Sequence, residues 1–130
     1  MCPHLKTCLV VDDSPVIRKV SRRILEDLGF EVAEAANGVA AMAWCDAMMP
    51  DVILLDWRMP EMDGLEVLRR VRASRGGSVP QVIFCSGETE IERIREALEA
   101  GADEYIMKPF DGAIVAGKLQ SLGLLQVRAA

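Results

Sequence analysis

The chain alternates short apolar runs with amphipathic stretches, and this alternation limits its fold more than any other feature. The runs are rich in β-branched residues, as strands are, whereas the stretches between them carry the apolar spacing of helices. Strands that alternate with helices predict an α/β fold, in which helices cover both faces of a parallel sheet. A length of 130 residues suits one such domain.

Five strands and five helices are expected. The strands are predicted at residues 8–11, 31–35, 52–56, 81–86 and 104–107. The third is continuously apolar, as a central strand buried on both faces should be. The helices are predicted to begin at Ser14-Pro15, at Asn37-Gly38, at Asp63-Gly64, near Thr89 and after Phe110. The fourth helix is expected to pack one face, formed by Ile91, Ile94, Ala97 and Leu98.

Composition and charge exclude several classes of function. The net charge of −5 argues against nucleic acid as a partner. The apolar runs fall far short of the roughly 20 residues that a membrane helix needs, and the first residues lack a signal-peptide core. We therefore expect a cytoplasmic protein that does not bind membranes. Its four cysteines are scattered and it has one histidine, so free thiols are expected rather than a zinc site.

Polar residues stand where the predicted strands end. Asp12 and Asp13 follow the first strand, Asp56 ends the third, Ser86 ends the fourth and Lys108 follows the fifth. The carboxyl ends of parallel strands meet at one edge of the sheet, which is where ligands bind in such folds. We therefore expect these five side chains to form one site.

The residue types at this edge point to phosphoryl chemistry. Three carboxylates repel one another and need a counter-charge, and Mg²⁺, with Mn²⁺ as a substitute, suits an all-oxygen site that keeps several waters. Lys108 and Ser86 could hold phosphoryl oxygens, which leaves Asp56 as the nucleophile. Each residue also has a plainer explanation: Asp13 as a helix cap, Ser86 as a turn residue and Lys108 as a solvated lysine.

The sequence resembles the receiver domain of two-component response regulators. The similarity runs from about residue 6 to about residue 125 and implies a flavodoxin-like sheet with the strand order 2-1-3-4-5. It also implies that residues 1–130 are one stand-alone receiver domain without an output domain. The matching stretches are 10–14, 54–64, 86–87 and 105–110.

The resemblance assigns roles to the acidic residues. It implies that Asp12, Asp13 and Asp56 bind Mg²⁺ together with the backbone carbonyl of Arg58. It also implies that Asp56 is the phosphoacceptor.

Further roles follow from the same resemblance. Ser86 and Tyr105 would form a switch pair, in which Ser86 moves to the phosphoryl group and Tyr105 turns inward. Lys108 would hold the phosphoryl group and form a cis peptide with Pro109.

Three residues near the site carry more particular expectations. Arg58 and Glu88 correspond to positions that flank the path of the hydrolytic water in receivers. A pair between them would slow self-dephosphorylation, whereas two solvated charges would contribute almost nothing, and both interpretations stay open. Trp57 is expected to be partly exposed.

The expected function is a signalling switch rather than a turnover enzyme. The phosphodonor would be a histidine kinase or a histidine phosphotransfer protein, docked at the start of the first helix around Ser14, Pro15 and Ile17. An output partner would bind residues 89–125. The first helix also carries a basic stripe, which is either a solvated face or a docking surface for an acidic donor: Arg18, Lys19, Arg22 and Arg23.

Other functions remain as alternatives. The chain could be a phosphate shuttle or sink within a relay. An aspartate-based phosphatase would carry its nucleophile after the first strand, in an Asp-x-Asp arrangement that this sequence lacks. A flavin carrier would need a phosphate-binding loop at the same place, where Asp12 and Asp13 would repel phosphate.

Overall fold

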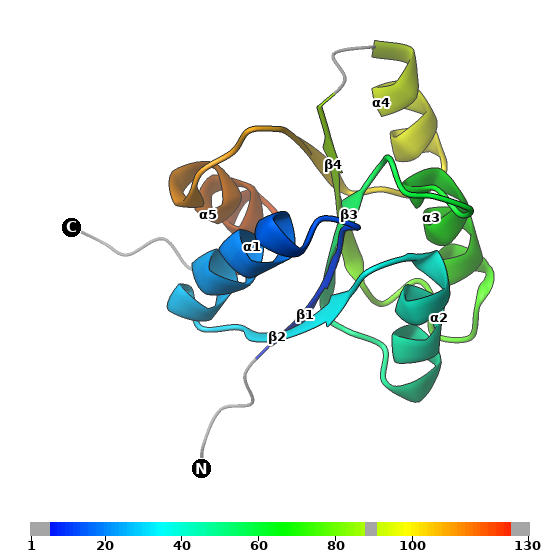
Figure 1. The fold of residues 1–130 in the computed structure, drawn as a ribbon, viewed down its shortest axis with the longest axis horizontal. Coiled ribbons are helices and arrows are strands. Elements are labelled where there is room, and N and C mark those ends of the chain that lie inside the picture. Colours follow the sequence, from blue (N-terminus) through cyan, green and yellow to red (C-terminus); the bar gives the residue numbers. More distant parts are fainter. Residues whose placement is uncertain (1–5, 88–90, 126–130) are drawn as a thin grey trace.

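The structure is a computed structural model that describes residues 6–87 and 91–125. Five strands and five helices alternate along this part of the chain (Figure 1). The strands are β1 Thr7–Val11, β2 Glu31–Ala35, β3 Val52–Asp56, β4 Gln81–Ser86 and β5 Glu104–Met107. The helices are α1 Pro15–Asp27, α2 Gly38–Ala47, α3 Gly64–Ala73, α4 Ile91–Glu99 and α5 Gly112–Ser121.

All strand pairs are parallel, and their order is β2-β1-β3-β4-β5. The predicted fold class and strand order are therefore confirmed. Helices α1 and α5 cover one face of the sheet, and α2, α3 and α4 cover the other (Figure 1). The order reverses between β1 and β3, which places the topological switch point of the sheet at the ends of these two strands.

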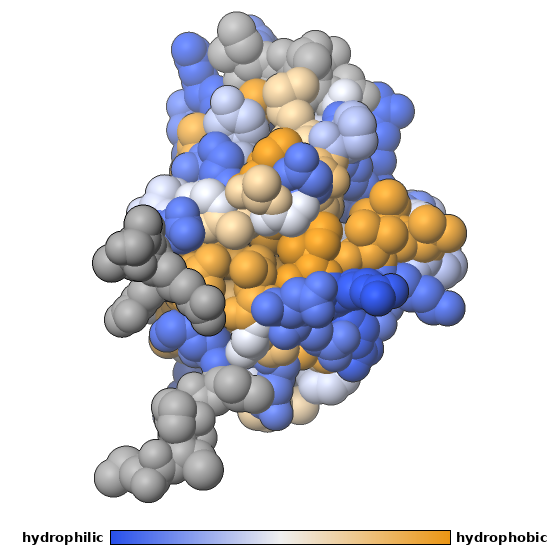
Figure 2. Space-filling model, turned by 90° about the vertical axis from the view of Figure 1, so that its left-hand side faces the viewer, coloured by the Kyte–Doolittle hydropathy of each residue, from blue (hydrophilic) through white to orange (hydrophobic). Residues whose placement is uncertain are grey.

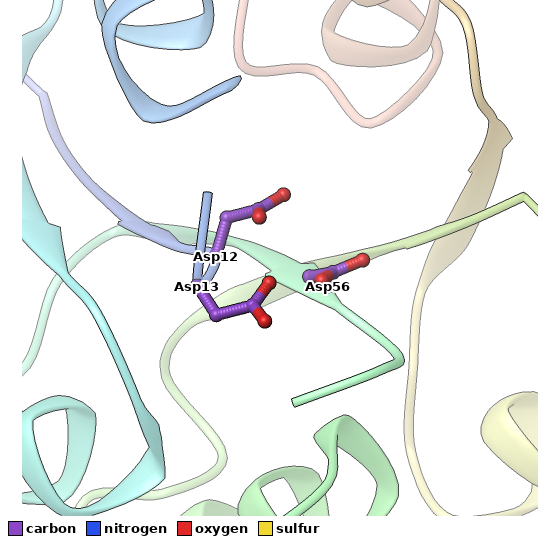
Figure 3. A group of neighbouring side chains, drawn as sticks. All are labelled: Asp12, Asp13 and Asp56. Atoms are coloured by element: carbon purple, nitrogen blue, oxygen red, sulfur yellow. The ribbon is translucent and has the colours of Figure 1, made fainter. Parts of the chain in front are cut away.

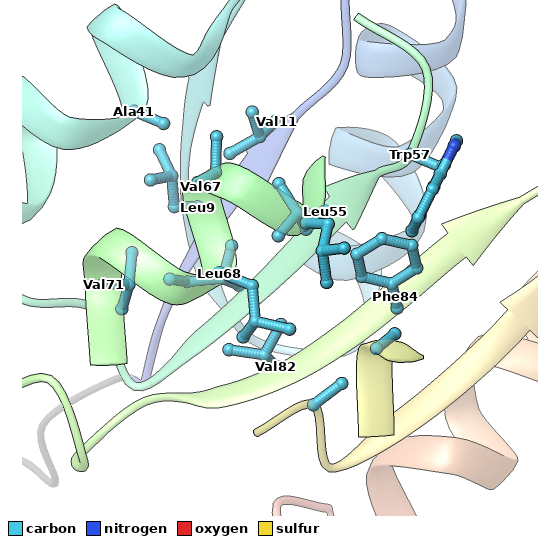
Figure 4. Packing of buried hydrophobic residues seen from close by; sticks show 14 of the residues in the cluster. Leu9, Val11, Ala41, Leu55, Trp57, Val67, Leu68, Val71, Val82 and Phe84 are labelled. Atoms are coloured by element: carbon cyan, nitrogen blue, oxygen red, sulfur yellow. The ribbon is translucent and has the colours of Figure 1, made fainter. Parts of the chain in front are cut away.

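The core has two layers because side chains alternate across the sheet. Leu9 and Leu55 face the layer under α2 and α3, where Leu68 and Val71 pack against them (Figure 4). The alternate residues of the two strands, Cys8 and Val10 of β1 and Val52 and Leu54 of β3, face the layer under α1 and α5. All five residues of β3 are buried, as the continuous apolar run predicted. Each fully buried Leu contributes about 2 kcal/mol to the free energy of unfolding, relative to an exposed Leu.

The helix starts confirm the capping predictions that fall on described residues. The Ser14 Oγ accepts a hydrogen bond of 3.3 Å from the backbone N–H of Ile17, and Pro15 is the first residue of α1. The Asp63 Oδ1 accepts one of 2.9 Å from the N–H of Glu66. Because Ser14 caps α1, the explanation of Asp13 as a helix cap is wrong. The expected start of α4 near Thr89 lies outside the described residues.

The predicted inner face of α4 is partly wrong. Ala97 is buried, as expected, but Leu98 is 45% exposed. Leu98 directly follows the buried Ala97, so its position fits the apolar spacing of an amphipathic helix. It nevertheless lies beyond the edge of the face of α4 that packs inward. Leu98 instead lines an open surface hollow with Ile94 and Arg95.

Three cysteines of the described chain are free and buried, as the composition indicated: Cys8, Cys45 and Cys85. Burial raises the pKa of all three thiols. Within the described residues, no helix is long and apolar enough to cross a membrane.

The interior of α5 offers a stabilising substitution. Gly117 lies within the helix, and a Cβ there would meet open space, whereas Gly112 begins the helix and Gly123 follows it. Gly117→Ala is expected to raise the free energy of unfolding by about 0.5–1 kcal/mol, because Ala loses less backbone entropy in a helix. Urea unfolding of the variant and the parent measures the difference, and an unchanged or lower midpoint would contradict this account of α5.

Candidate metal and phosphoacceptor site

Three carboxylates meet at the carboxyl ends of β1 and β3 (Figure 3). Val11 of β1 pairs with Leu55 of β3, so the next residues, Asp12 and Asp56, emerge side by side. One oxygen of each of Asp12, Asp13 and Asp56 lies within 4.8 Å of the others. Asp12 is 3% exposed and Asp56 is 6% exposed, whereas Asp13 faces solvent. The predicted acidic cluster is present.

Lys108 bridges the two buried carboxylates. Its Nζ lies 2.8 Å from Asp12 Oδ2 and 2.8 Å from Asp56 Oδ1. Burial alone would lower the pKa of Lys108, but its hydrogen bonds to both carboxylates outweigh burial and raise it. The explanation of Lys108 as a solvated loop lysine is therefore wrong. Its ammonium supplies part of the counter-charge that the three carboxylates need.

The backbone holds Lys108 in this position. Its N–H donates a hydrogen bond of 2.9 Å to the carbonyl of Ser86 at the end of β4. The Lys108–Pro109 peptide is cis, as the resemblance implies. The side chain thus starts from the end of β5 and reaches across the end of β4 to the acidic cluster.

The surroundings of Asp56 shift the pKa of its carboxyl group. Its pKa is raised, chiefly by burial, with Asp12 and Asp13 adding to the increase and Lys108 opposing it. Three ionised carboxylates and one ammonium leave two negative charges uncompensated. A divalent cation would remove this excess charge and favour the ionised form of Asp56.

Asp13 provides the open side of the site. It lines an open pocket with Trp57, Arg58, Met59 and other residues of the loop after β3. The three carboxylates are hard oxygen ligands, and the exposed one leaves room for the waters that Mg²⁺ retains. The residues present therefore fit the predicted ion, and Arg58 stands at the pocket where its carbonyl is expected to be a ligand.

Gly64 lets α3 begin against the backbone of Asp56. Its N–H donates a hydrogen bond of 2.9 Å to the carbonyl of Trp57. A Cβ at Gly64 would collide with the carbonyl oxygen of Asp56. Only glycine allows this close approach between helix and strand end.

Gly64→Ala is therefore expected to destabilise the fold and disturb the site together. Relief of the collision would shift either α3 or the end of β3, at a cost of about 1–3 kcal/mol. Thermal unfolding measures the loss, with Gly87→Ala as the control because a Cβ at Gly87 meets open space. Equal stability of the two variants would contradict the described packing.

Ser86 and Tyr105, the predicted switch pair, lie on neighbouring strands. Both are half-buried, and they line the same small cavity together with Trp57 and Arg93. Lys118 of α5 places its Nζ 5.1 Å from the centre of the Tyr105 ring and 3.2 Å from Glu104. The two residues thus border one cavity, with Ser86 opposite Met107 and Tyr105 opposite Phe84 in the paired strands.

Trp57 is buried, so the expectation that it is partly exposed is wrong. It is 6% exposed and packs edge-on against Phe84, with ring centres 5.1 Å apart (Figure 4). The guanidinium of Arg93 lies 4.8 Å from the centre of its ring. Residues from β4 and α4 cover the indole, and no signal near Trp57 in the sequence could have shown this.

The remaining predictions divide. Glu88 lies outside the described residues, so the idea that it pairs with Arg58 stays a prediction. Two members of the basic stripe are not simply solvated, because Arg18 and Arg22 both form ion pairs with Glu34 of β2, at 3.2 and 2.8 Å. The other two members, Lys19 and Arg23, are exposed.

Comparison with known proteins gives one family. The model of the response regulator receiver domain matches residues 8–119. The chemotaxis protein CheY of Listeria monocytogenes is 41% identical over 103 residues, which are 78% of this chain and 85% of that protein.

Solved structures agree. CheY4 of Vibrio cholerae superposes with a TM-score of 0.86 and 33% identity, over 91% of this chain and 98% of that one. The receiver domain of a sensor histidine kinase from Pseudomonas aeruginosa, which has a magnesium ion coordinated in its active site cleft, gives a TM-score of 0.82 and 30% identity. That likeness covers 91% of this chain and 97% of the other. The chain therefore belongs to the response regulator receiver domain family of two-component signalling and is similar to CheY.

Proposed function

We propose that this receiver domain takes a phosphoryl group onto Asp56 from a phosphohistidine, in a reaction that depends on Mg²⁺. The observation that carries the proposal is the meeting of three carboxylates and one ammonium around Asp56. Such a site can hold a cation, present an oxygen nucleophile and stabilise the charge of a phosphoryl group.

The residues that would hold Mg²⁺, or Mn²⁺ in its place, are Asp12, Asp13, Asp56 and the backbone carbonyl of Arg58. When bound, the ion would neutralise charge on the carboxylates and on the phosphoryl oxygens. The all-oxygen donor set supports this assignment, as does the magnesium ion in the cleft of the Pseudomonas relative.

The protein's own groups would perform the transfer. A carboxylate oxygen of Asp56 forms the new bond to phosphorus while the bond between phosphorus and the donor's imidazole nitrogen breaks. The electron pair and the proton remain with the histidine. Lys108 already donates to Asp56, so its ammonium can pass to a phosphoryl oxygen with little movement, and Ser86 can donate to another.

The same movement would carry the signal. When the Ser86 hydroxyl turns to the phosphoryl group, the cavity that it shares with Tyr105 enlarges and the ring can move inward. That movement would break the contact of Lys118 with the ring and alter the surface of α4, β5 and α5. An output partner that reads residues 89–125 would sense the change.

The phosphodonor would dock beside the acidic cluster at the start of α1. Ser14 and Pro15 follow Asp13 directly. Apolar surface forms a band on the side of the molecule where α1 and α5 lie (Figure 2). Val16, Val20 and Ile114 are among the exposed apolar residues of these two helices. A histidine kinase or histidine phosphotransfer protein would cover this band.

The chain would then act as a switch, or as a phosphate sink in a relay, but not as a turnover enzyme. The protein is incubated with a small acyl or amido phosphodonor, either with Mg²⁺ or with a chelator, and phosphoryl incorporation is measured by intact mass spectrometry. A separate assay measures whether the protein releases phosphate from phosphate esters. One phosphoryl group per chain that requires Mg²⁺, without turnover of esters, supports the proposal. Rapid hydrolysis of many esters would identify a phosphatase, and no incorporation would overturn the proposal.

A further inference from the structure

Arg18 makes a contact that links the acidic cluster to the edge of the sheet. Its Nη1 donates a hydrogen bond of 2.7 Å to the backbone carbonyl of Asp12. Its Nε donates to Glu34 Oε1 of β2 at 3.2 Å. The side chain is 17% exposed, so the guanidinium lies largely within the structure rather than in solvent.

Glu34 is itself held firmly. Its second oxygen accepts a hydrogen bond of 2.8 Å from Arg22 Nη1, and this bond lowers the pKa of Glu34. A carboxylate fixed from two sides anchors the Arg18 guanidinium in turn. Arg18 therefore links the carbonyl of Asp12, through hydrogen bonds, to Glu34 on the neighbouring strand β2.

This carbonyl controls where Asp13 lies. The carbonyl of Asp12 and the N–H of Asp13 belong to one rigid peptide plane, so a bond that orients the carbonyl also orients the start of Asp13. Asp12 is fixed by other bonds as well, because its N–H donates to Ala35 and its Oδ1 accepts from the N–H of Ser14. By contrast, the Asp13 carboxylate makes no hydrogen bond within residues 6–87 and 91–125.

We propose that Arg18 is a positioning residue for the divalent-cation site, which aims Asp13 by fixing the peptide between Asp12 and Asp13. The proposal rests on the proposed function, since it assumes that the acidic cluster binds Mg²⁺. Arg18 itself would not touch the ion. Residues that orient metal ligands through hydrogen bonds typically change affinity by about 10–100-fold when they are replaced.

The positive charge of Arg18 determines the direction in which Mg²⁺ affinity would change if Arg18 acted by electrostatics alone. A cation near the site repels Mg²⁺, so removal of a positive charge should by itself tighten binding. Loss of positioning should weaken binding. The two effects are opposite, and a merely electrostatic role cannot imitate the expected result.

The experiment is calorimetric titration of Mg²⁺ into the parent protein and three variants. Arg18→Met is expected to bind Mg²⁺ about tenfold more weakly. Arg18→Lys keeps the charge but replaces the rigid, planar fork of the guanidinium with a single ammonium nitrogen on a flexible stem, so its Mg²⁺ affinity should fall between those of the parent and Arg18→Met. Lys19→Met removes a neighbouring exposed charge of the same helix and should bind as tightly as the parent or slightly more tightly.

The outcomes separate this inference from the proposed function. If the parent does not bind Mg²⁺, the proposed function fails. If the parent binds and Arg18→Met binds equally or more tightly, Arg18 does not position the site. Thermal unfolding establishes that each variant is folded at the titration temperature. Should the Met variant be unfolded there, Arg18→Lys decides, and parental affinity in that variant overturns the proposal.

Discussion

Asp56→Asn is expected to abolish phosphorylation by small phosphodonors and by a phosphorylated histidine protein. The amide has nearly the shape of the carboxylate but offers no anionic oxygen to attack phosphorus. It also removes one of the three charges that would hold Mg²⁺. Intact mass spectrometry after incubation with donor and Mg²⁺ measures the effect, which should be complete loss of the added phosphoryl group.

Asp63→Asn is the matched control for this substitution. Asp63 lines the same open pocket as Asp13, and its role in the structure is to cap α3. Asn caps helices as well as Asp does, so the control variant should fold and accept phosphate as the parent does. Phosphorylation of Asp56→Asn at the parental level would show that the nucleophile is another residue.

Arg72→Met is expected to lower the free energy of unfolding more than replacement of any other charged residue of α3. The Arg72 guanidinium joins three parts of the chain. It donates to the carbonyls of Gly77 at 2.8 Å, Pro80 at 2.7 Å and Gly101 at 2.7 Å, and it pairs with Asp103 at 2.9 Å. Its side chain is 19% exposed, so water can replace these bonds only in part.

The expected loss is about 3 kcal/mol, because several backbone acceptors lose a charged donor at once. Arg70 provides the control on the same helix. It forms an exposed pair with Glu66, with side chains 55% and 46% exposed, and Arg70→Met should cost about 0.5 kcal/mol or less. Urea unfolding compares the two variants. A similar loss in both would contradict the view that Arg72 joins the loops after α3 and α4.

Much of the sheet could be predicted because its signals are local. The continuous apolar run at 52–55, which ends at Asp56, indicates a strand buried on both faces, and β3 spans Val52–Asp56. The polar residues that end the strands indicate one site, because parallel strands place their carboxyl ends at a common edge. Asp12, Asp13, Asp56 and Lys108 do meet there.

Contacts between distant segments could not be predicted from such patterns. Trp57 is buried because Phe84 and Arg93, from other elements, cover it. Leu98 has helical spacing but lies past the edge of the packed face of α4. Arg18 belongs to a stripe of basic residues, and only the position of Glu34 on the adjacent strand distinguishes it from its exposed neighbours.

The most direct test of the account is the position of the phosphoryl group in the parent protein. The label would be trapped by reductive cleavage, and the tryptic peptide from Ile24 to Arg58 would be sequenced by tandem mass spectrometry. This peptide holds Asp56 together with other acidic residues, so fragmentation distinguishes them. The account predicts modification at Asp56 alone, and only when Mg²⁺ is present. Modification at another residue, or equal labelling in the presence of a chelator, would contradict it.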